Sequence, residues 1–492
     1  MANSKIKRLI SDVLSGREHA NQLVGILKYI SPDAKQSHAI EAIRGAIQVF
    51  TRHCNDGDLL FVTSTASLPT DDVYRSWLGE RLNDCFKNIL KCLCEDQGGF
   101  YLQSCMDLLR LKSQQQSRSS KETVFPEDDL SDLCKVVLSD IELVFSFNDS
   151  FLTFDDVRHY VLKVMPNVVN DLLNKNPLCV EQVFMFLQCI VSHMPQDGAE
   201  MTSCFVVVDN ESDCKFGVSL LQHRKKFSAA WLEFLKRSLP ASVHKSVLVM
   251  LHTGLIPNFA KPRLLADFLM QSYSRGGGLA LLGLHGLFVL IHQYNLEYPD
   301  FYKNVYAMLH PRVFSARYKA RFFHLLDLFL SSTHIPAYLV AAFAKKLARL
   351  CLVAPADVSC VMVALILNLL RRHPNIRHLI HCEAQKADSQ LQQDPFVEDE
   401  ADPVRCRAME SSLWELSALK SHFSADVVKC ASVKRLGRLE SDIGKLLDRD
   451  YDDLFNESCL FKFDESAMNH AVPESLFGCF EDSVLDLWDV GV

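Results

Sequence analysis

Apolar side chains recur at helical spacing along most of the chain, most clearly between residues 319 and 374. In the first run of this stretch, five large apolar residues fall at positions i, i+3, i+4, i+7 and i+8: Phe322, Leu325, Leu326, Phe329 and Leu330. This spacing places them on one face of a helix, which we expect to be buried. Ser331–Thr333 ends the helix, and Pro336 suits the first turn of the next one, where no backbone N–H is needed.

Two further helices follow after short breaks. The second has one apolar face, made of Leu339, Ala342, Phe343, Leu347 and Leu350. Its cations Lys345, Lys346 and Arg349 should therefore lie toward water. The third helix, from Asp357 to Arg372, is apolar on nearly every side and should be buried by its neighbours. Helices joined by short turns pack as antiparallel neighbours, as in helical repeats of about 40 residues.

The same pattern extends over the rest of the chain, so we predict an all-α, HEAT- or armadillo-like helical-repeat solenoid with irregular acidic loops. Polar or acidic stretches divide it into an N-terminal helical region (1–112), a polar linker (113–126), a middle helical region (127–255) with a surface loop at 196–217, a basic helical core (256–382), an acidic loop (383–402), an amphipathic helix region (403–435) and an acidic, aromatic tail (436–492). We expect the tail to be partly disordered, because acidic residues mixed with bulky apolar ones suit a segment that orders only on a partner.

Charge is distributed unevenly along the chain. Between Pro311 and His378, ten Lys and Arg residues stand against two Asp residues, a net charge of +8 that leaves −16 for the rest. A candidate basic face for rRNA or an acidic partner is made of Arg312, Arg317, Lys319, Arg321, Lys345, Lys346, Arg349, Arg371 and Arg372. Two alternatives stay open, since these residues could simply solvate the repeat or pair with the acidic loop. Base-specific RNA recognition is not expected, because no consensus with stacking aromatics appears.

The region after residue 402 is a second candidate contact. Asp402-Pro403 forms a good helix start, and the helix it opens should carry its apolar side chains on one side. Such a stripe serves either as core packing or as a contact with a partner helix. The candidate partner-contact residues are Leu413, Trp414, Leu416 and Phe423, with Trp414 beside the main stripe.

Residue patterns typical of catalysis or of metal binding are weak. Gly278 and Gly283 have the spacing of a phosphate loop, but Leu284 and His285 stand where Lys and Ser or Thr are required. We therefore expect these glycines to form a turn and a close helix contact. The histidines that follow Arg372 lack the paired ligands of a zinc site, and no nucleophile motif is present. The sequence predicts a non-enzymatic protein with no cofactor and no metal.

Cysteine usage and hydropathy bear on location. The 17 cysteines are scattered and no secretory signal precedes them, so we expect the reduced thiols of the nucleus or cytosol. Hydropathy alone could flag 279–293, 325–343 and 358–370 as transmembrane, but each is too short or too interrupted for the ~20 residues that cross a bilayer. We expect buried solenoid helices instead.

Two segments are long enough to carry a family resemblance. They are YPDFYKNVYAMLHPRVFSARYKARFFHLLDLFLSSTHIPAYLVAAFAKKLARL at 298–350, and DPFVEDEADP with AMESSLWELSALKSHF between 394 and 423. They resemble the CCAAT-binding-factor family of ribosome-assembly proteins. The resemblance implies a nucleolar scaffold that acts on small-subunit (40S) precursors, supports 18S rRNA maturation and subunit export, and forms a stable heterodimer with another factor of the small-subunit processome. Pre-ribosomal particles and rRNA are the other implied partners. The alternative is a nuclear transport or protein-binding adaptor without RNA contact.

Overall fold

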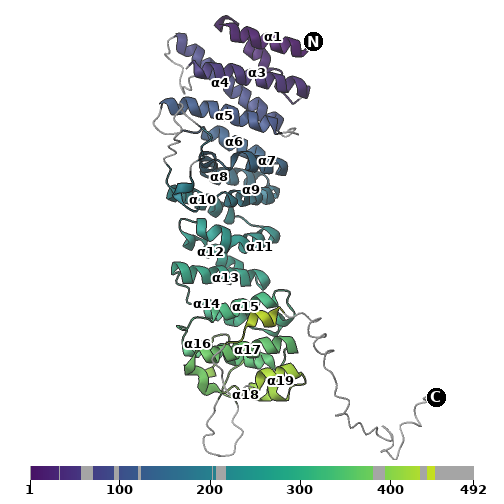
Figure 1. The fold of residues 1–492 in the computed structure, drawn as a ribbon, viewed down its shortest axis with the longest axis vertical. Coiled ribbons are helices and arrows are strands. Elements are labelled where there is room, and N and C mark those ends of the chain that lie inside the picture. The colour runs from purple at the N-terminus through teal and green to yellow at the C-terminus, as the bar shows by residue number, and fades with distance from the viewer. Residues whose placement is uncertain are drawn as a thin grey trace, which may run out of the picture. The chain divides into compact units, whose positions relative to one another are not determined.

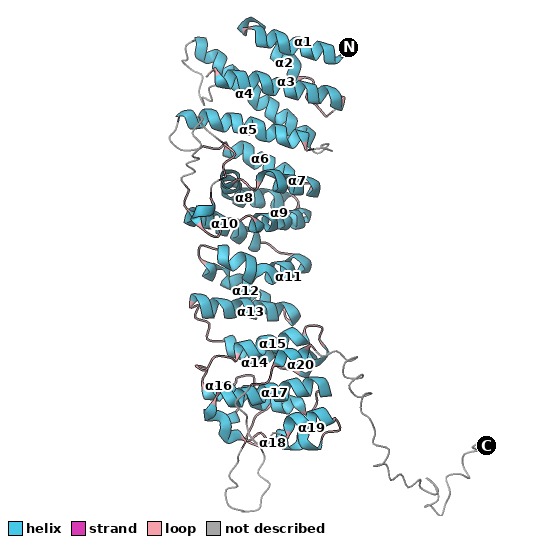
Figure 2. Ribbon diagram, viewed as in Figure 1, coloured by secondary structure: helices cyan, strands magenta, loops and turns pink. Residues whose placement is uncertain are grey.

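The computed structural model describes residues 2–32, 34–56, 70–93, 99–119, 124–201, 203–206, 218–380, 394–432 and 440–448. Every regular element in these ranges is a helix, which confirms the all-α prediction (Figure 2). Most of the predicted tail at 436–492 lies outside the described residues, as do parts of the predicted loops at 383–402 and 196–217 and of the linker at 113–126. The chain divides into two compact units, Met1–Phe301 and Tyr302–Val492.

The first unit is a stack of helices (Figure 1). Its helices are α1 (Ala2–Ser15), α2 (Gln22–Leu27), α3 (Gln36–Asn55), α4 (Thr70–Cys92), α5 (Phe100–Ser119), α6 (Glu127–Val137), α7 (Ile141–Phe151), α8 (Asp155–Lys175), α9 (Val180–Ser192), α10 (Leu220–Leu235), α11 (Ala241–Met250), α12 (Ala266–Ser274) and α13 (Gly277–Tyr294). Helices two apart in the sequence pack together, as α1 does with α3, α6 with α8 and α8 with α10. Sequential packing of this kind is the arrangement of helical-repeat proteins.

The second unit is organised around one buried helix. Its helices are α14 (Phe301–Met308), whose first residue belongs to the first unit, α15 (Lys319–Phe329), α16 (Ala337–Cys351), α17 (Ala356–Arg372), α18 (Trp414–Ala418), α19 (Ala425–Ala431) and α20 (Ile443–Leu447). Helix α17 packs against α16, α19 and α20, and it is buried without a break from Val361 to Leu370. The predicted burial of this helix on nearly every side is therefore confirmed.

The helix faces predicted for α15 and α16 are also confirmed. All five apolar residues predicted on the buried face of each helix are less than a tenth exposed, from Phe322 to Leu330 and from Leu339 to Leu350. Pro336 is the N-cap of α16. The spacing of apolar residues was sufficient to predict these buried faces, because each helix buries one continuous stripe of apolar side chains.

The close helix contact predicted from the glycines is present between α12 and α13. A Cβ atom on Gly283 would lie 3.0 Å from the backbone oxygen of Leu269 and 3.2 Å from the Cβ of Ser272. Helix α13 is the one helix, among the described residues, that is long and apolar enough to cross a membrane by length and composition. Its buried side includes Leu284 and Leu287. A place in the core of a helical repeat explains the apolar composition of α13 as well as a membrane span would.

The polar linker predicted at 113–126 is wrong over its first part, because α5 continues to Ser119. Its polar residues are used in tertiary contacts. Lys112, at the end of the preceding region, donates to Asp129 at 2.6 Å, and the Ser113 hydroxyl donates to the backbone oxygen of Val124. These long-range partners hold a helix where the residue types alone suggest a loop.

The surface loop predicted at 196–217 is partly buried. Phe205 and Val206 are 7% and 2% exposed, and their backbone N–H groups donate to the carboxylate of Asp156 at 2.9–3.0 Å. Asp155, one residue earlier, accepts from the backbone N–H of Ser203 at 3.0 Å and pairs with Arg158. The first turn of α8 therefore anchors this segment through two buried carboxylates.

Candidate interaction surface

The predicted basic face separates into three groups in the second unit, and Lys345 shows the largest departure from expectation. Its side chain is buried on α16, so the prediction that it lies toward water is wrong. The ammonium group lies 2.6 Å from Glu415 Oε1 and 2.8 Å from Asp394 Oδ2, and it donates to the backbone oxygen of Ser412 at 2.7 Å. A buried cation is stable only with such partners.

Arg349, one turn further along α16, belongs to the same network. Its guanidinium lies 2.9 Å from Asp394 Oδ2 and 3.1 Å from Glu415 Oε1, and it stacks on the Trp414 ring at 4.9 Å. The Trp414 indole N–H donates to Asp394 at 2.9 Å. We call the set Lys345, Arg349, Asp394, Trp414 and Glu415 the buried clamp. It fastens residues 394–415 to α16.

The two carboxylates of the clamp respond to this environment in opposite directions. Burial raises the pKa of Glu415 despite its contact with Lys345. Burial would also raise the pKa of Asp394, but hydrogen bonds from Lys345, Ser411 and Trp414 outweigh it and hold that pKa well below its usual range. Asp394 is therefore the fixed negative charge of the clamp.

Four other predicted cations are also engaged within the second unit. Lys346 donates to the backbone oxygen of Tyr306 at 3.0 Å and sits over that ring at 3.9 Å. Lys319 pairs with Asp357 at 2.7 Å. Arg371 donates to Asn368 at 2.8 Å, and Arg372 pairs with Asp327 and Glu440 at 2.8 and 2.6 Å.

Three cations of the predicted face remain exposed: Arg312, Arg317 and Arg321. Arg312 lies in the 3-10 turn Pro311–Ser315, Arg317 in the turn that follows, and Arg321 in the first turn of α15. Within the described residues, no ion pair involves any of the three. We call them the arginine trio.

The predicted partner-contact residues do not share one long helix. Leu413 is buried, and its backbone N–H donates to the oxygen of Leu379 at 2.8 Å instead of to a helical carbonyl. Only Trp414–Ala418 is α-helical, and Leu416 there is half-buried. Trp414 is 42% exposed, and Phe423 is 89% exposed beyond the helix end. The single amphipathic helix predicted from Asp402 onward is therefore wrong.

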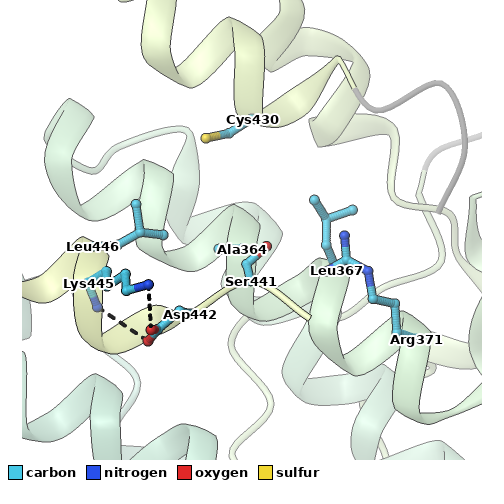
Figure 3. A pocket seen from close by; sticks show the side chains of 8 residues that line it. All are labelled: Ala364, Leu367, Arg371, Cys430, Ser441, Asp442, Lys445 and Leu446. Atoms are coloured by element: carbon cyan, nitrogen blue, oxygen red, sulfur yellow. Dashed lines mark hydrogen bonds and ion pairs between the residues drawn. The ribbon is translucent and has the colours of Figure 1, made fainter. Parts of the chain in front are cut away.

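A pocket that the sequence did not reveal lies between α17, α19 and α20 (Figure 3). It measures about 390 Å³ and is lined by Ala364, Leu367, Arg371, Cys430, Ser441, Asp442, Lys445 and Leu446. No group of three or more His, Cys, Asp or Glu side chains placed to hold a metal occurs in the described part of the chain. The pocket joins an apolar interior to a charged edge.

Two parts of the chain match known family models. Residues 280–431 match the CBF/Mak21 family, and residues 1–174 match the nucleolar complex protein 4-like TPR repeats. The chain is 36% identical to nucleolar complex protein 4 homolog B of Xenopus laevis, over 96% of this chain and 93% of that protein. The chain belongs to the nucleolar complex protein 4 family. It is also 35% identical to the human homolog, covering 90% and 89% of the two chains, and 30% identical to the Arabidopsis thaliana protein NUCLEOLAR COMPLEX ASSOCIATED 4, covering 87% and 84%.

Membership of the nucleolar complex protein 4 family confirms the resemblance found in the sequence and extends it. The sequence resemblance rested on two segments between residues 298 and 423, whereas the relatives match nearly the whole chain, including the N-terminal repeats. The family places the protein in the nucleolus, in ribosome biogenesis. Neither matching family model describes a catalytic activity.

Proposed function

We propose that the protein is a non-enzymatic scaffold that acts on nucleolar precursors of the small ribosomal subunit and supports 18S rRNA maturation. In this proposal it works as a stable heterodimer with a second assembly factor of the small-subunit processome. The observation that carries the proposal is the arginine trio, because it places three exposed positive charges within ten residues of a chain whose net charge is −8. Its ligand would be the phosphate backbone of precursor rRNA.

Local stability gives no reason for the arginine trio. Arg321 and Lys319 lie in the first turn of α15, which contains no acidic residue. The positive end of the helix dipole is there, so a cation at this position is mildly unfavourable to the helix. Lys319 is neutralised by Asp357, whereas Arg321 is exposed. A charge placed against the helix dipole and facing water is better explained by a ligand outside the chain.

The remaining basic residues have a different part in the proposal. Lys345 and Arg349 hold the buried clamp, and Arg372 bridges two carboxylates, so they shape the second unit instead of touching RNA. Phe423 is the candidate for contact with the protein partner, because it is a large aromatic side chain with 89% of its surface exposed. Trp414 lies nine residues earlier with two-fifths of its surface free.

The test is affinity purification of the full chain from nucleolar extract, with and without nuclease. The variant Arg312→Glu/Arg317→Glu/Arg321→Glu should lose most of its association with pre-ribosomal particles, because it replaces three attractive charges by three repulsive ones. Its thermal stability should stay within a few degrees of the parent, since all three side chains are exposed. Phe423→Ala should instead release the protein partner that persists after nuclease treatment.

A matched control changes the charge by the same amount elsewhere. Lys225, Lys245 and Lys261 are exposed in the first unit, and their reversal to Glu should leave the association unchanged. Equal loss from both triple variants would mean that only net charge matters. Unchanged particle association of the arginine variant would contradict RNA contact and favour the adaptor without RNA.

A further inference from the structure

Ser315 lies between two members of the arginine trio. Arg312 precedes it by three residues and Arg317 follows it by two, in the sequence RVFSAR. Protein kinases of the basophilic class select a serine by arginines at such offsets, because acidic pockets on the kinase bind the guanidinium groups. Four serines of the chain have an arginine three residues before them: Ser11, Ser113, Ser315 and Ser441. Of these, Ser315 is the one that also has an arginine two residues after it.

The structure presents this serine to solvent together with its arginines. Arg312 and Ser315 are both exposed in the 3-10 turn Pro311–Ser315. Side chains three residues apart in a 3-10 helix eclipse one another, so the guanidinium and the hydroxyl lie on the same face. Ala316 continues the chain in an extended conformation, with φ −79° and ψ 141°, and Arg317 is exposed beyond it.

The other three serines with an arginine at this spacing are placed differently. Ser113 is completely buried, and its hydroxyl donates to a backbone oxygen. Ser11 is exposed but lies inside α1, which would have to unwind before an active site could enclose it. Ser441 is half-buried, and its backbone N–H donates to a side chain of α17. Ser315 therefore combines the full arginine pattern with an exposed turn.

We propose that Ser315 is phosphorylated by a basophilic serine kinase, and that the phosphate switches off the arginine trio as an rRNA contact. The second half of this proposal rests on the proposed function. In the transfer, the Ser315 Oγ attacks the γ-phosphorus of ATP, the bond from that phosphorus to the bridging β–γ oxygen breaks, and ADP leaves. The hydroxyl proton passes to the catalytic aspartate of the kinase.

The phosphate would neutralise most of the positive charge of the arginine trio. A phosphoserine carries a charge of about −1.5 to −2 at neutral pH, against the three positive charges of the trio. Its oxygens accept charge-assisted hydrogen bonds from guanidinium groups, and both Arg312 and Arg317 are near neighbours in the sequence. These are the groups that the phosphates of rRNA would contact. The modification therefore lowers the local charge and competes for the same donors.

Phosphorylation of the purified full chain tests the first half of the proposal. The catalytic fragment of protein kinase C, with ATP, should modify Ser315, and mass spectrometry of the digested protein locates the phosphate. Arg317→Ala should slow this reaction several-fold, since it removes one of the two arginines. Ser113 should stay unmodified in the folded chain because it is buried. If Ser315 were not modified under conditions that modify a peptide of residues 309–320, the proposal would be wrong.

RNA binding tests the second half, with a fluorescent polyuridylate RNA as the probe. Phosphorylation of the parent chain should weaken binding about tenfold and make the dependence of log Kd on log salt shallower by roughly one to two phosphate contacts. Ser315→Ala, treated with the kinase in the same way, should bind like the untreated parent. Ser315→Glu should weaken binding to a smaller extent. Ser331→Glu, at an exposed position just beyond the other end of α15, is the control for added negative charge and should leave binding unchanged.

The outcomes distinguish this inference from the proposed function. If Arg312→Glu/Arg317→Glu/Arg321→Glu loses RNA binding while the phosphorylated parent keeps it, the switch is refuted and the RNA contact stands. If neither the triple variant nor phosphorylation changes RNA binding, the RNA contact of the proposed function is contradicted, and the switch with it. Modification of Ser315 itself is decided by mass spectrometry, independently of RNA.

Discussion

At the scale of single residues, the interior of the second unit contains a complete charge network. Lys345 and Glu415 are both fully buried, and Asp394 holds its charge beside them. Taking such groups out of water costs several kcal/mol per ion, which their mutual attraction must offset. Removing one partner therefore leaves a carboxylate in a medium that cannot solvate it.

Lys345→Met should destabilise the full chain by about 3–5 kcal/mol, because it leaves Glu415 buried with only Arg349 nearby. Lys345→Met/Glu415→Leu should recover a large part of that loss, since it removes both charges. Urea unfolding measures the change. Arg321→Met, on the exposed side of α15, is the control and should stay within about 0.5 kcal/mol of the parent. If Lys345→Met unfolded at the same urea concentration as this control, the network would not be structural.

Lys345 also shows where prediction from the sequence ended. The spacing of its neighbours on α16 places Lys345 beside the apolar stripe, and a polar residue in that position is usually exposed to solvent. Its partners Asp394 and Glu415 stand 49 and 70 positions later in the chain. The acidic loop was expected as a possible partner of basic residues, but nothing in the local pattern indicates which of the nine cations it reaches. The arginine trio could be separated from the other six cations only in three dimensions.

At the scale of elements, a helix was predicted correctly from the sequence where it buries one continuous stripe of apolar side chains. The spacing in α15, α16 and α17 was decisive, and all three helices were predicted correctly. After residue 402 the leucines have similar spacing, yet the chain turns, because the Leu413 N–H bonds to Leu379 across the fold. Local periodicity cannot anticipate a hydrogen bond to a residue 34 positions away.

The contact of α12 with α13 gives a prediction at this scale. Gly283→Ala should destabilise the first unit by about 1–3 kcal/mol, because the new methyl group meets a backbone oxygen at 3.0 Å. Helix propensity acts in the opposite direction and favours Ala by about 1 kcal/mol. Gly25→Ala in α2 is the matched control, since its methyl group meets only Leu9 at 3.9 Å. Thermal unfolding should move down for the first variant and slightly up for the second. If the unfolding temperature rose in both variants, α12 and α13 could move apart to fit the new methyl group at little cost in free energy.

At the scale of the whole molecule, the two units bury different titratable groups. The second unit depends on Asp394, whose pKa is held low. In the first unit, burial lowers the pKa of His159 to about 4, of His223 to about 3 and of His244 to about 4. His223 accepts from Arg158 Nε at 3.1 Å, which requires an unprotonated Nε2. These histidines are therefore neutral inside the fold at neutral pH.

Mild acid should consequently weaken the first unit. Unfolded histidine binds its proton near pH 6.5, whereas these side chains resist protonation until about pH 3–4, so the unfolded state holds more protons in between. Stability conferred by each neutral histidine is present above pH 6.5 and is lost as the pH falls, at up to about 1.4 kcal/mol per pH unit. Hydrogen exchange of α8 and α10 at pH 7, 6 and 5, corrected for the intrinsic rate, measures this slope. His223→Gln keeps an acceptor for Arg158 but cannot titrate, so it should make the slope shallower by one proton, while the exposed His19→Gln should leave it unchanged. An identical slope in the parent and His223→Gln would show that His223 is protonated within the folded unit, with Arg158 turned away from it.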